Sequence, residues 1–298
     1  MKQKIIKIIK KIFKVKSKEQ LVARYRLRIN KRLYREKISI KGLIEHLKTL
    51  GIRRGSNVFI HSSWGEFYNY EGSINDFIDS ILNLIGPEGT IAMPANPLLR
   101  SEKSIFNVAK TPTLGGMIAE TFRNYKGVTR SCHVRHSVCA IGPQSDFLLS
   151  EHHLSKTSWD KKSPYYKLSK IDAKILSFGL GRTFVGTSLH CAESILREEH
   201  PYFNSLFGKV VVYKYKNYSG QLCEHTDLSD DGIRREFTKR SHLRVINRSF
   251  DKNKYKKTRL SNLTINVFDA NYAINRIIEL GRNGIVVYTQ PNPKKYFK

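Results

Sequence analysis

The sequence predicts an α/β fold, with a central mixed β-sheet flanked by helices and a basic helical arm at the N-terminus. The sheet and its helices are predicted because short apolar segments that end at glycine alternate with amphipathic segments along residues 41–298. The arm is predicted because residues 1–40 hold fifteen Lys or Arg and two acids. We therefore expect two parts, an arm over 1–40 and one domain over 41–298.

Helices and strands of the domain are placed by apolar periodicity and by the turn residues beside them. Amphipathic spacing behind a capping residue indicates a helix, and a short apolar run that ends at glycine indicates a strand. These patterns predict helices over 39–47, 73–84 and 271–280, and strands over 57–61, 90–93, 137–141, 174–179, 208–215 and 284–289. Residues 217–262 are polar and weakly patterned, so no element is assigned to them.

The arm has the pattern of a helix that lies on an anionic membrane. Its apolar side chains would share one helix face beside a row of lysines, and they are Ile5, Ile8, Ile9, Ile12 and Val15. Each cation near an anionic surface adds up to about 1 kcal/mol of attraction. The alternative is a basic helix that docks on its own domain or stays frayed. The sequence contains no recognised nucleic-acid-binding module, so specific binding of nucleic acid is not expected.

The charge balance and the cysteines limit the classes of function. The chain holds 53 Lys plus Arg against 25 Asp plus Glu, a formal net charge of +28 that attracts anionic ligands and repels polycations. Its four cysteines form no C-x-x-C pair, which favours a reducing cytosol. There is no continuous secretory apolar segment and no run of about 20 apolar residues. We expect a cytoplasmic protein, and the sequence leaves open whether residues 1–40 bind the inner face of the membrane or pack on the domain.

Four polar clusters are candidate functional segments. The first follows a predicted strand, where polar residues of α/β sheets often meet a ligand, and the second is rich in Arg and His, which suit phosphate. The third combines a Ser-Pro turn with two tyrosines, and the fourth contains a His and a Glu three residues apart. They occupy residues 58–63, 129–137, 163–166 and 186–193. Taken singly, each is also compatible with a structural role as a turn cap, surface loop, core aromatic or surface pair.

The fourth cluster has the pattern of a general base with its carboxylate partner. With Thr187 or Ser188 as the N-cap of a helix, His190 and Glu193 lie on one helix face at i, i+3 spacing. A carboxylate fixes the tautomer of an imidazole and stabilises the imidazolium. The pair as two metal ligands is an alternative, but no third ligand has the spacing of a metal motif. Cys191 as a nucleophile paired with His190 is disfavoured, because adjacent helix residues point about 100° apart.

Seven short segments follow one another in a fixed order between residues 41 and 207. They are Leu50-Gly51-Ile52 with Gly55, Ile60-His61-Ser62-Ser63, the segment 86–94, Thr111-Pro112-Thr113 with Gly115-Gly116, Arg130-Ser131-Cys132-His133 with Ser137 and Gly142, Ser163-Pro164, and the segment 187–193. In this order the chain resembles the aminoglycoside 3-N-acetyltransferase family. The ordered set is far more specific than any one segment.

The resemblance implies an α/β acetyltransferase, different in fold from the common GNAT enzymes, that uses acetyl-CoA and no metal. It implies that His190 is the catalytic base and that Glu193 orients it. It also implies a group of residues near coenzyme A, and these are His61, Ser62, Ser63, Arg130, Ser131, His133 and Ser163. Asn107 and Thr187 are assigned to the acceptor.

Departures from the family pattern bear on the acceptor. The family has Phe-Asp-Pro where this chain has Phe106-Asn107-Val108, so an acid suited to a cationic substrate is missing, and His133 is followed by Val134 instead of proline. Together with the net charge, this predicts a nucleotide-linked or lipid-linked amino sugar used in surface-polysaccharide biosynthesis. The alternative is an aminoglycoside 3-N-acetyltransferase that confers antibiotic resistance. From another class, the alternative is a non-catalytic, membrane-associated scaffold, which the intact segment 187–193 argues against.

Overall fold

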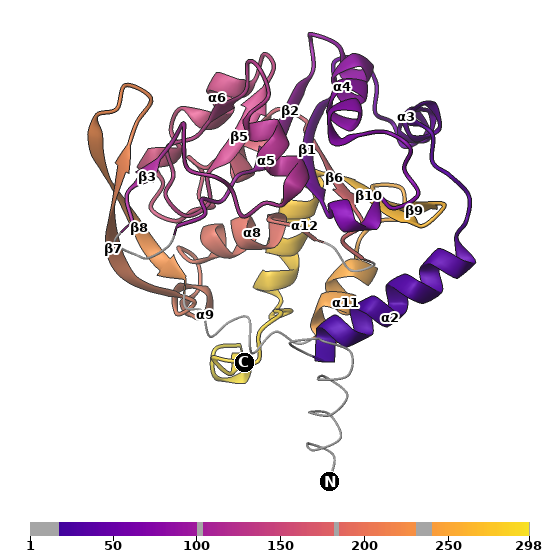
Figure 1. Ribbon diagram of the computed structural model, residues 1–298. Helices are drawn as coiled ribbons and strands as arrows, with labels where there is room; N and C mark the ends of the chain where they lie inside the picture. The colour runs from indigo at the N-terminus through magenta and orange to yellow at the C-terminus, as the bar shows by residue number, and fades with distance from the viewer. Residues whose placement is uncertain (1–17, 100–103, 182–184, 231–239, 298) are drawn as a thin grey trace.

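The computed structural model describes residues 18–99, 104–181, 185–230 and 240–297 of the 298-residue chain. It contains a seven-stranded sheet and a three-stranded sheet, with helices packed around the larger one (Figure 1). The strands are β1 (Asn57–Ser62), β2 (Thr90–Pro94), β3 (Phe106–Asn107), β4 (Thr129–Arg130), β5 (Val138–Ile141), β6 (Lys174–Phe178), β7 (Phe207–Lys216), β8 (Leu222–Asp230), β9 (Tyr255–Leu260) and β10 (Leu263–Asp269). The α-helices are α2 (Lys18–Leu33), α3 (Ile40–Thr49), α4 (Ile74–Ile85), α5 (Met117–Arg123), α6 (Ser145–Leu149), α7 (Pro164–Lys167), α8 (Ser188–Leu196), α9 (Pro201–Asn204), α11 (Arg240–Arg248) and α12 (Ala270–Arg282).

The seven-stranded sheet has the order β4-β5-β2-β1-β6-β10-β9. β1 pairs in parallel with β2 on one side and with β6 on the other, whereas β5 and β10 join this parallel centre in antiparallel fashion. The predicted mixed sheet of an α/β fold is therefore confirmed. Because the chain places β2 and β6 on opposite sides of β1, the carboxyl end of β1 is a switch point of the sheet. Ligands of open α/β sheets bind in the crevice at such a point.

Alternation along β1 shows how the sequence builds a core on each face of the sheet. Val58 and Ile60 belong to the core that contains α3, α4 and α5, whereas Phe59 belongs to the core that contains α8 and α12. Each of these three side chains is at most 1% exposed. A parallel strand buried on both faces reads as a continuous apolar run, which is the pattern the sequence shows here. Burial of each such side chain contributes roughly 1.5–3 kcal/mol, so β1 holds both helical layers to the sheet.

The helices α3 and α4 begin at capping residues that the sequence makes visible. Ser39 Oγ accepts a hydrogen bond from Gly42 N at 3.0 Å at the start of α3. Ser73 and Asp76 form a reciprocal capping box at the start of α4. Gly86 ends α4 with a φ of 67°, which residues with a Cβ rarely adopt. The helices predicted over 39–47 and 73–84 are confirmed.

The remaining element predictions divide into confirmed ones and one that is wrong. The predictions over 57–61, 90–93, 137–141, 174–179, 208–215 and 271–280 are confirmed as β1, β2, β5, β6, β7 and α12. The strand predicted over 284–289 is wrong. Val286, Val287 and Tyr288 are buried there, but in an irregular segment. An apolar run alone does not distinguish a strand from other buried backbone.

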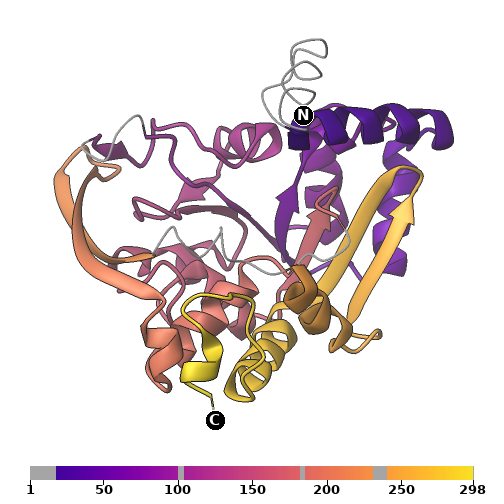
Figure 2. The same cartoon turned by 90° about the horizontal axis from the view of Figure 1, so that it is seen from below.

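Residues 217–262, to which the sequence assigned no element, supply β8, α11 and β9. β8 pairs antiparallel with β7 in a long hairpin that projects from one side of the molecule (Figures 1 and 2). β9 is the edge strand of the large sheet, and Lys256 and Lys257 are exposed on it. Strands that face water over much of their surface need few apolar residues, so their periodicity is weak.

The N-terminal arm is described from α2 onward. The apolar face predicted for residues 5–15 lies outside the described residues. α2 lies along the outside of the domain (Figures 1 and 2), where Lys31 Nζ is 5.5 Å from the ring centre of Tyr68. Ile38 is 2% exposed and forms a β-bridge with Tyr70. The chain is thus packed against the domain before α3 begins.

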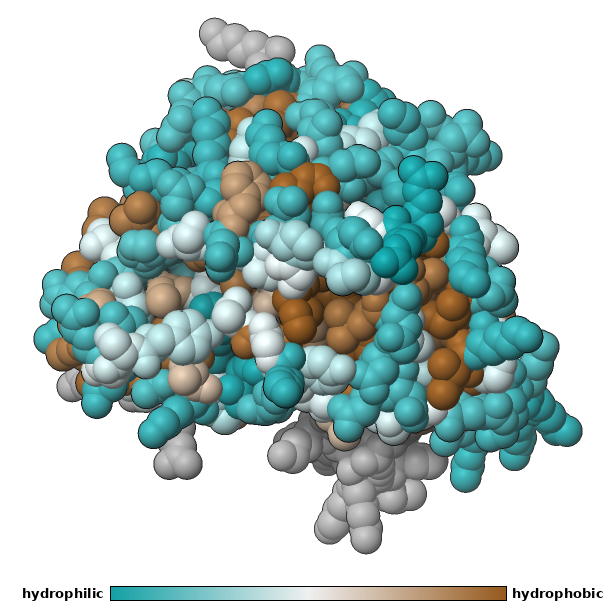
Figure 3. All heavy atoms as spheres, turned by 90° about the horizontal axis from the view of Figure 1, so that it is seen from above, coloured by the Kyte–Doolittle hydropathy of each residue, from teal (hydrophilic) through white to brown (hydrophobic). Residues whose placement is uncertain are grey.

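The surface carries mainly polar residues. The face shown in Figure 3 is largely hydrophilic, and its apolar residues gather near the middle, partly in a hollow. Among the helices of the described part of the chain, none combines the length and the apolar character that crossing a membrane requires.

Candidate active site

A pocket of about 1000 Å³ lies at the carboxyl ends of the parallel strands. Its wall includes His61 and Ser62 from β1, Pro94 from β2 and Leu180 from the turn after β6. These strands end at the same edge of the sheet because they run parallel. The volume is at the top of the usual range of about 300–1,000 Å³ for ligand pockets. The pocket therefore has room for a large coenzyme together with part of an acceptor.

His190 and Glu193 form a hydrogen-bonded pair at this pocket. His190 Nδ1 lies 3.0 Å from Glu193 Oε2. The side chain of His190 is 34% exposed and lines the pocket, whereas that of Glu193 is 4% exposed and lies behind it. The carboxylate accepts the Nδ1–H, so the neutral ring keeps its lone pair on Nε2. This arrangement can take a proton from a ligand in the pocket.

The first turn of α8 differs in one detail from the prediction. Thr187 is the N-cap residue and lines the pocket, but its side chain makes no capping hydrogen bond. The turn is closed by the backbone, because Cys191 N donates to Thr187 O at 3.1 Å. Cys191 is fully buried, and burial raises the pKa of its thiol well above the usual range. Its thiolate is therefore disfavoured at neutral pH, which argues against Cys191 as the nucleophile.

His61, Ser62 and Ser63 line the same pocket as His190. Burial lowers the pKa of His61 to about 4, so its ring is neutral at neutral pH. Ser63 N donates to Phe178 O at 3.0 Å, which fixes the turn after β1 against β6. The structure thus brings these three residues to the same pocket as His190. Their contact with coenzyme A stays a prediction.

Arg130 is buried and is not among the residues that line the pocket, and its expected place near the coenzyme stays a prediction. Arg130 is 3% exposed. Its guanidinium donates hydrogen bonds to Ser137 Oγ at 2.9 Å and to the backbone oxygens of Thr111 and Ala95. Its cation also lies 4.8 Å from the ring centre of Phe106. Burial lowers the pKa of Arg130 to about 10, which leaves it charged at neutral pH. Arg130 ties together the segments that support the pocket.

Ser131, His133 and Ser163 are also buried, with at most 1% exposed, and none of them lines the pocket. Ser131 Oγ lies 2.8 Å from His152 Nδ1. Ser163 Oγ caps α7 by accepting a hydrogen bond from Tyr166 N at 3.2 Å. Their expected positions near the coenzyme stay a prediction. The three side chains support the backbone around the pocket.

Asn107 likewise lies away from the pocket lining, in β3. Its Oδ1 accepts hydrogen bonds from Ala109 N at 3.1 Å and Lys110 N at 3.0 Å. This is a turn that Asp forms equally well. The exchange of Asp for Asn here therefore says little about the charge of the acceptor. Of the two residues assigned to the acceptor, the structure brings Thr187 to the pocket and not Asn107.

The sequence patterns do not indicate an aromatic residue, Trp159, that lies next to His190. The ring centre of Trp159 lies 4.7 Å from that of His190 and 4.4 Å from that of His136. Trp159 is 5% exposed, and both it and His136 line the pocket. Tyr288, in the segment wrongly predicted as a strand, lines the pocket as well. No local pattern identifies Trp159, because tertiary packing brings it to His190.

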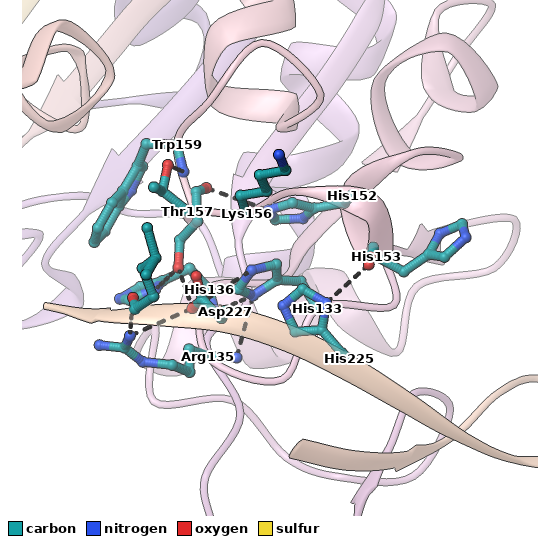
Figure 4. Close-up of polar contacts among 12 residues, drawn as sticks. His133, Arg135, His136, His152, His153, Lys156, Thr157, Trp159, His225 and Asp227 are labelled. Atoms are coloured by element: carbon teal, nitrogen blue, oxygen red, sulfur yellow. Dashed lines mark hydrogen bonds and ion pairs between the residues drawn. The ribbon is translucent and has the colours of Figure 1, made fainter. Parts of the chain in front are cut away.

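A buried cluster of His133, His225 and Asp227 lies near the pocket-lining residues Arg135 and His136 (Figure 4). The possible ligand atoms of these three residues lie within 4.8 Å of one another. Two imidazoles and a carboxylate at this spacing can hold a metal ion. However, His133 Nδ1 accepts the backbone N–H groups of Arg135 and His136, at 3.2 and 3.1 Å. The neutral ring of His133 therefore carries its proton on Nε2 and is a hydrogen-bond donor toward the cluster. A metal ligand there would have to lose that proton, so the hydrogen bonds argue against a metal.

Comparison with known proteins points to one family. The family model described as aminoglycoside 3-N-acetyltransferase matches residues 59–280. A prophage-derived aminoglycoside N(3')-acetyltransferase-like protein of Bacillus subtilis (strain 168) is 31% identical over 176 residues, covering 51% of this chain and 64% of that protein. Aminoglycoside N(3)-acetyltransferase IV of Salmonella sp is 28% identical over 194 residues, and the alignment covers 63% of this chain and 72% of that protein. The first alignment thus spans less than two thirds of the relative's length.

Solved structures share the fold. AAC-IIIb in its binary complex with CoASH has a TM-score of 0.69 at 17% identity, covering 82% of this chain and 96% of that chain. A mutant of aminoglycoside acetyltransferase AAC(3)-IVa in complex with gentamicin has a TM-score of 0.70 at 22% identity, and the match covers 87% of this chain and 94% of that chain. Identities this low establish the likeness of fold. Because the family model matches well over half of the residues, the chain belongs to the aminoglycoside 3-N-acetyltransferase family.

Proposed function

We propose that the chain transfers an acetyl group from acetyl-CoA to a primary amine of an amino sugar. The observation that carries this proposal is the His190–Glu193 pair beside a pocket of about 1000 Å³. The choice of ligands is supported by AAC-IIIb, which binds CoASH, and by AAC(3)-IVa, which binds gentamicin.

In the proposed reaction the amine nitrogen attacks the carbonyl carbon of the thioester. The C–N bond forms and the C–S bond breaks, so the thiol of coenzyme A leaves and takes up a proton. His190 Nε2 accepts the proton that the nitrogen loses, while Glu193 holds the Nδ1–H and stabilises the imidazolium. General-base catalysis of this kind contributes about 10²–10⁴-fold. The hydroxyls of Ser62 and Ser63 are candidates to stabilise the developing oxyanion.

Aminoglycosides are the acceptor class that the relatives support, because their names specify it. The expected nucleotide-linked or lipid-linked acceptor finds no support among them, and the turn that Asn107 forms does not favour it. One observation still favours an acceptor with less positive charge. Among the described residues that line the pocket, none is acidic, whereas the cationic Arg135 does line it. An amino sugar with an anionic substituent is therefore the second candidate.

Release of free thiol from acetyl-CoA tests the proposal with the purified full chain. Three acceptors are compared, namely an aminoglycoside, an uncharged hexosamine and a nucleotide-linked amino sugar. We expect turnover with at least one of them, and the ratio of kcat/KM decides between the two acceptor classes. Absence of thiol release with all three, together with no binding of acetyl-CoA by calorimetry, would contradict the proposal and favour the non-catalytic scaffold.

We also propose that α2 contacts an anionic membrane surface. Tyr25, Ile29 and Leu33 are spaced by four residues along one helix face, and they are 65%, 37% and 70% exposed. Arg28 and Arg32 are exposed on the same side. Apolar side chains flanked by cations suit the interface of an anionic bilayer.

Deletion of residues 1–33 is expected to abolish binding to vesicles that contain phosphatidylserine and to leave turnover of a soluble acceptor within twofold. The cut falls before Tyr34, whose backbone oxygen accepts a hydrogen bond from Asn69 Nδ2 at 2.8 Å. Co-sedimentation with the vesicles measures binding, and phosphatidylcholine vesicles are the control. Vesicle binding that survives the deletion would refute the membrane proposal, and loss of folding would assign the arm a structural role.

A further inference from the structure

A short segment, residues 156–160, packs against the helix that carries the base. Thr157 Oγ1 lies 2.5 Å from Ser194 Oγ on α8. Two residues further on, Trp159 packs against His190 with the ring planes 32° apart. Thr157 and Ser194 are 1% and 3% exposed, so their hydrogen bond is shielded from water. The position of this segment therefore influences the ring of the base.

The same segment is held from its other side by strand β8 of the hairpin. Leu228 N donates to Lys156 O at 2.9 Å. Ser158 Oγ donates to Asp227 Oδ2 at 3.1 Å, and both residues are 1% exposed. Asp227 is thus the buried anchor of the segment (Figure 4). A buried hydrogen bond to a carboxylate is stronger than one between neutral groups.

Asp227 also orders two side chains of the pocket wall. Ser158 gives its one hydroxyl proton to the carboxylate, so its oxygen accepts from His136 Nδ1 at 2.7 Å. Arg135 Nη1 donates to the same carboxylate oxygen, Oδ2, at 3.3 Å. His136 in turn packs against the Trp159 ring on which His190 lies. One buried carboxylate therefore fixes the groups on the wall beside the base.

We propose that Asp227 is a positioning residue of the acetyl-transfer reaction. It acts through Ser158 and His136 to hold Trp159 against His190, and it touches neither the substrate nor the coenzyme. The long β7–β8 hairpin thereby has a role in the chemistry, because it carries Asp227 to a buried position behind the pocket-lining residues Arg135 and His136. This inference rests on the proposed function. Misplacement of a reacting group by about 1 Å costs as much as 10²-fold in rate.

Substitution of Asp227 tests the proposal with the full chain. Asp227→Ala is expected to lower kcat at least tenfold and to change the KM for acetyl-CoA less than threefold, because orientation and not binding is lost. Asp227→Asn keeps an oxygen that can accept from Ser158 and Arg135, so it is expected to recover at least half of kcat. Glu224→Gln, an exposed position on β8, is the matched control and is expected to keep the wild-type kcat.

A second measurement does not depend on turnover. The indole N–H signal of Trp159 in a ¹⁵N NMR spectrum, assigned with Trp64→Phe, is expected to shift in Asp227→Ala and to return in Asp227→Asn. If Asp227→Ala fails to fold, Ser158→Ala removes the same link, and the same changes in kcat and in the Trp159 signal are expected. If the wild-type chain turns over no acceptor, the proposed function fails, whereas the NMR result still decides whether Asp227 positions Trp159.

Three results would overturn the proposal. The first is a kcat of Asp227→Ala within threefold of wild type in a folded protein. The second is an unmoved Trp159 signal in that variant. The third is one equivalent of zinc that co-purifies with the wild-type chain and is lost in Asp227→Asn but not in Glu224→Gln. That zinc would make Asp227 a metal ligand instead of a hydrogen-bond anchor.

Discussion

Replacement of His190 by alanine is expected to lower kcat/KM for acetyl transfer by about 10²–10⁴-fold, the range that general-base catalysis contributes. The imidazole lies at the pocket with Nδ1 held at 3.0 Å by a carboxylate. Without it, water or the bulk buffer must remove the proton from the amine. The fold should survive, because the side chain is 34% exposed and lies at the start of α8. Steady-state kinetics on the best acceptor measure the loss, and circular dichroism checks the fold.

Two further variants show whether the pair acts as a unit. In Glu193→Gln the amide can donate to His190 Nδ1, which would leave the ring proton on Nε2 and remove the acceptor for the amine proton. We expect a loss of at least tenfold in kcat. Glu198→Gln, whose side chain is 69% exposed beside Arg197, should keep wild-type kinetics. A His190→Ala enzyme that works within threefold of wild type would show that another group is the base.

The contact between His190 and Glu193 could be predicted from the sequence because its geometry is local, whereas the role of the pair came from the family resemblance. His190 and Glu193 are three residues apart on one helix, so their spacing alone places them on the same face. Strand β1, which contains His61, could be predicted for a similar reason, since a continuous apolar run followed by polar residues indicates a buried parallel strand. The mixed sheet followed from repeated alternation of such runs with amphipathic helices.

The supporting groups could not be predicted, because they depend on contacts between distant segments. Asp227 meets Ser158 across a sequence separation of 69 residues, and no spacing rule relates the two. The weak pattern of the exposed hairpin hid Asp227 as well. Arg130 was placed near the coenzyme by the family resemblance, and a guanidinium also suits phosphate. Composition cannot tell an arginine that faces a ligand from one that is buried on backbone carbonyls, and the contacts of Arg130 are of the second kind.

Because Arg130 is buried and donates to backbone carbonyls, Arg130→Ala is expected to have a large effect on stability. The substitution leaves the part-buried backbone oxygen of Thr111 without its donor, which costs about 1–3 kcal/mol, whereas the backbone oxygen of Ala95 keeps the hydrogen bond from Ser137 Oγ at 2.7 Å. It also removes the cation over Phe106, worth about 0.5–2 kcal/mol. We expect a loss of about 2–5 kcal/mol in the free energy of unfolding, measured by urea denaturation.

The control and the kinetics separate this structural role from the one that the family resemblance implied. Arg54→Ala removes an arginine whose pair with Glu88 is exposed at the surface, so it should leave the free energy of unfolding unchanged within error. If Arg130 instead contacted the coenzyme, Arg130→Ala would unfold at the wild-type urea concentration and show a raised KM for acetyl-CoA with kcat retained. If Arg130 is a buried structural residue, Arg130→Ala unfolds at a lower urea concentration than the wild type, and its KM for acetyl-CoA is not raised.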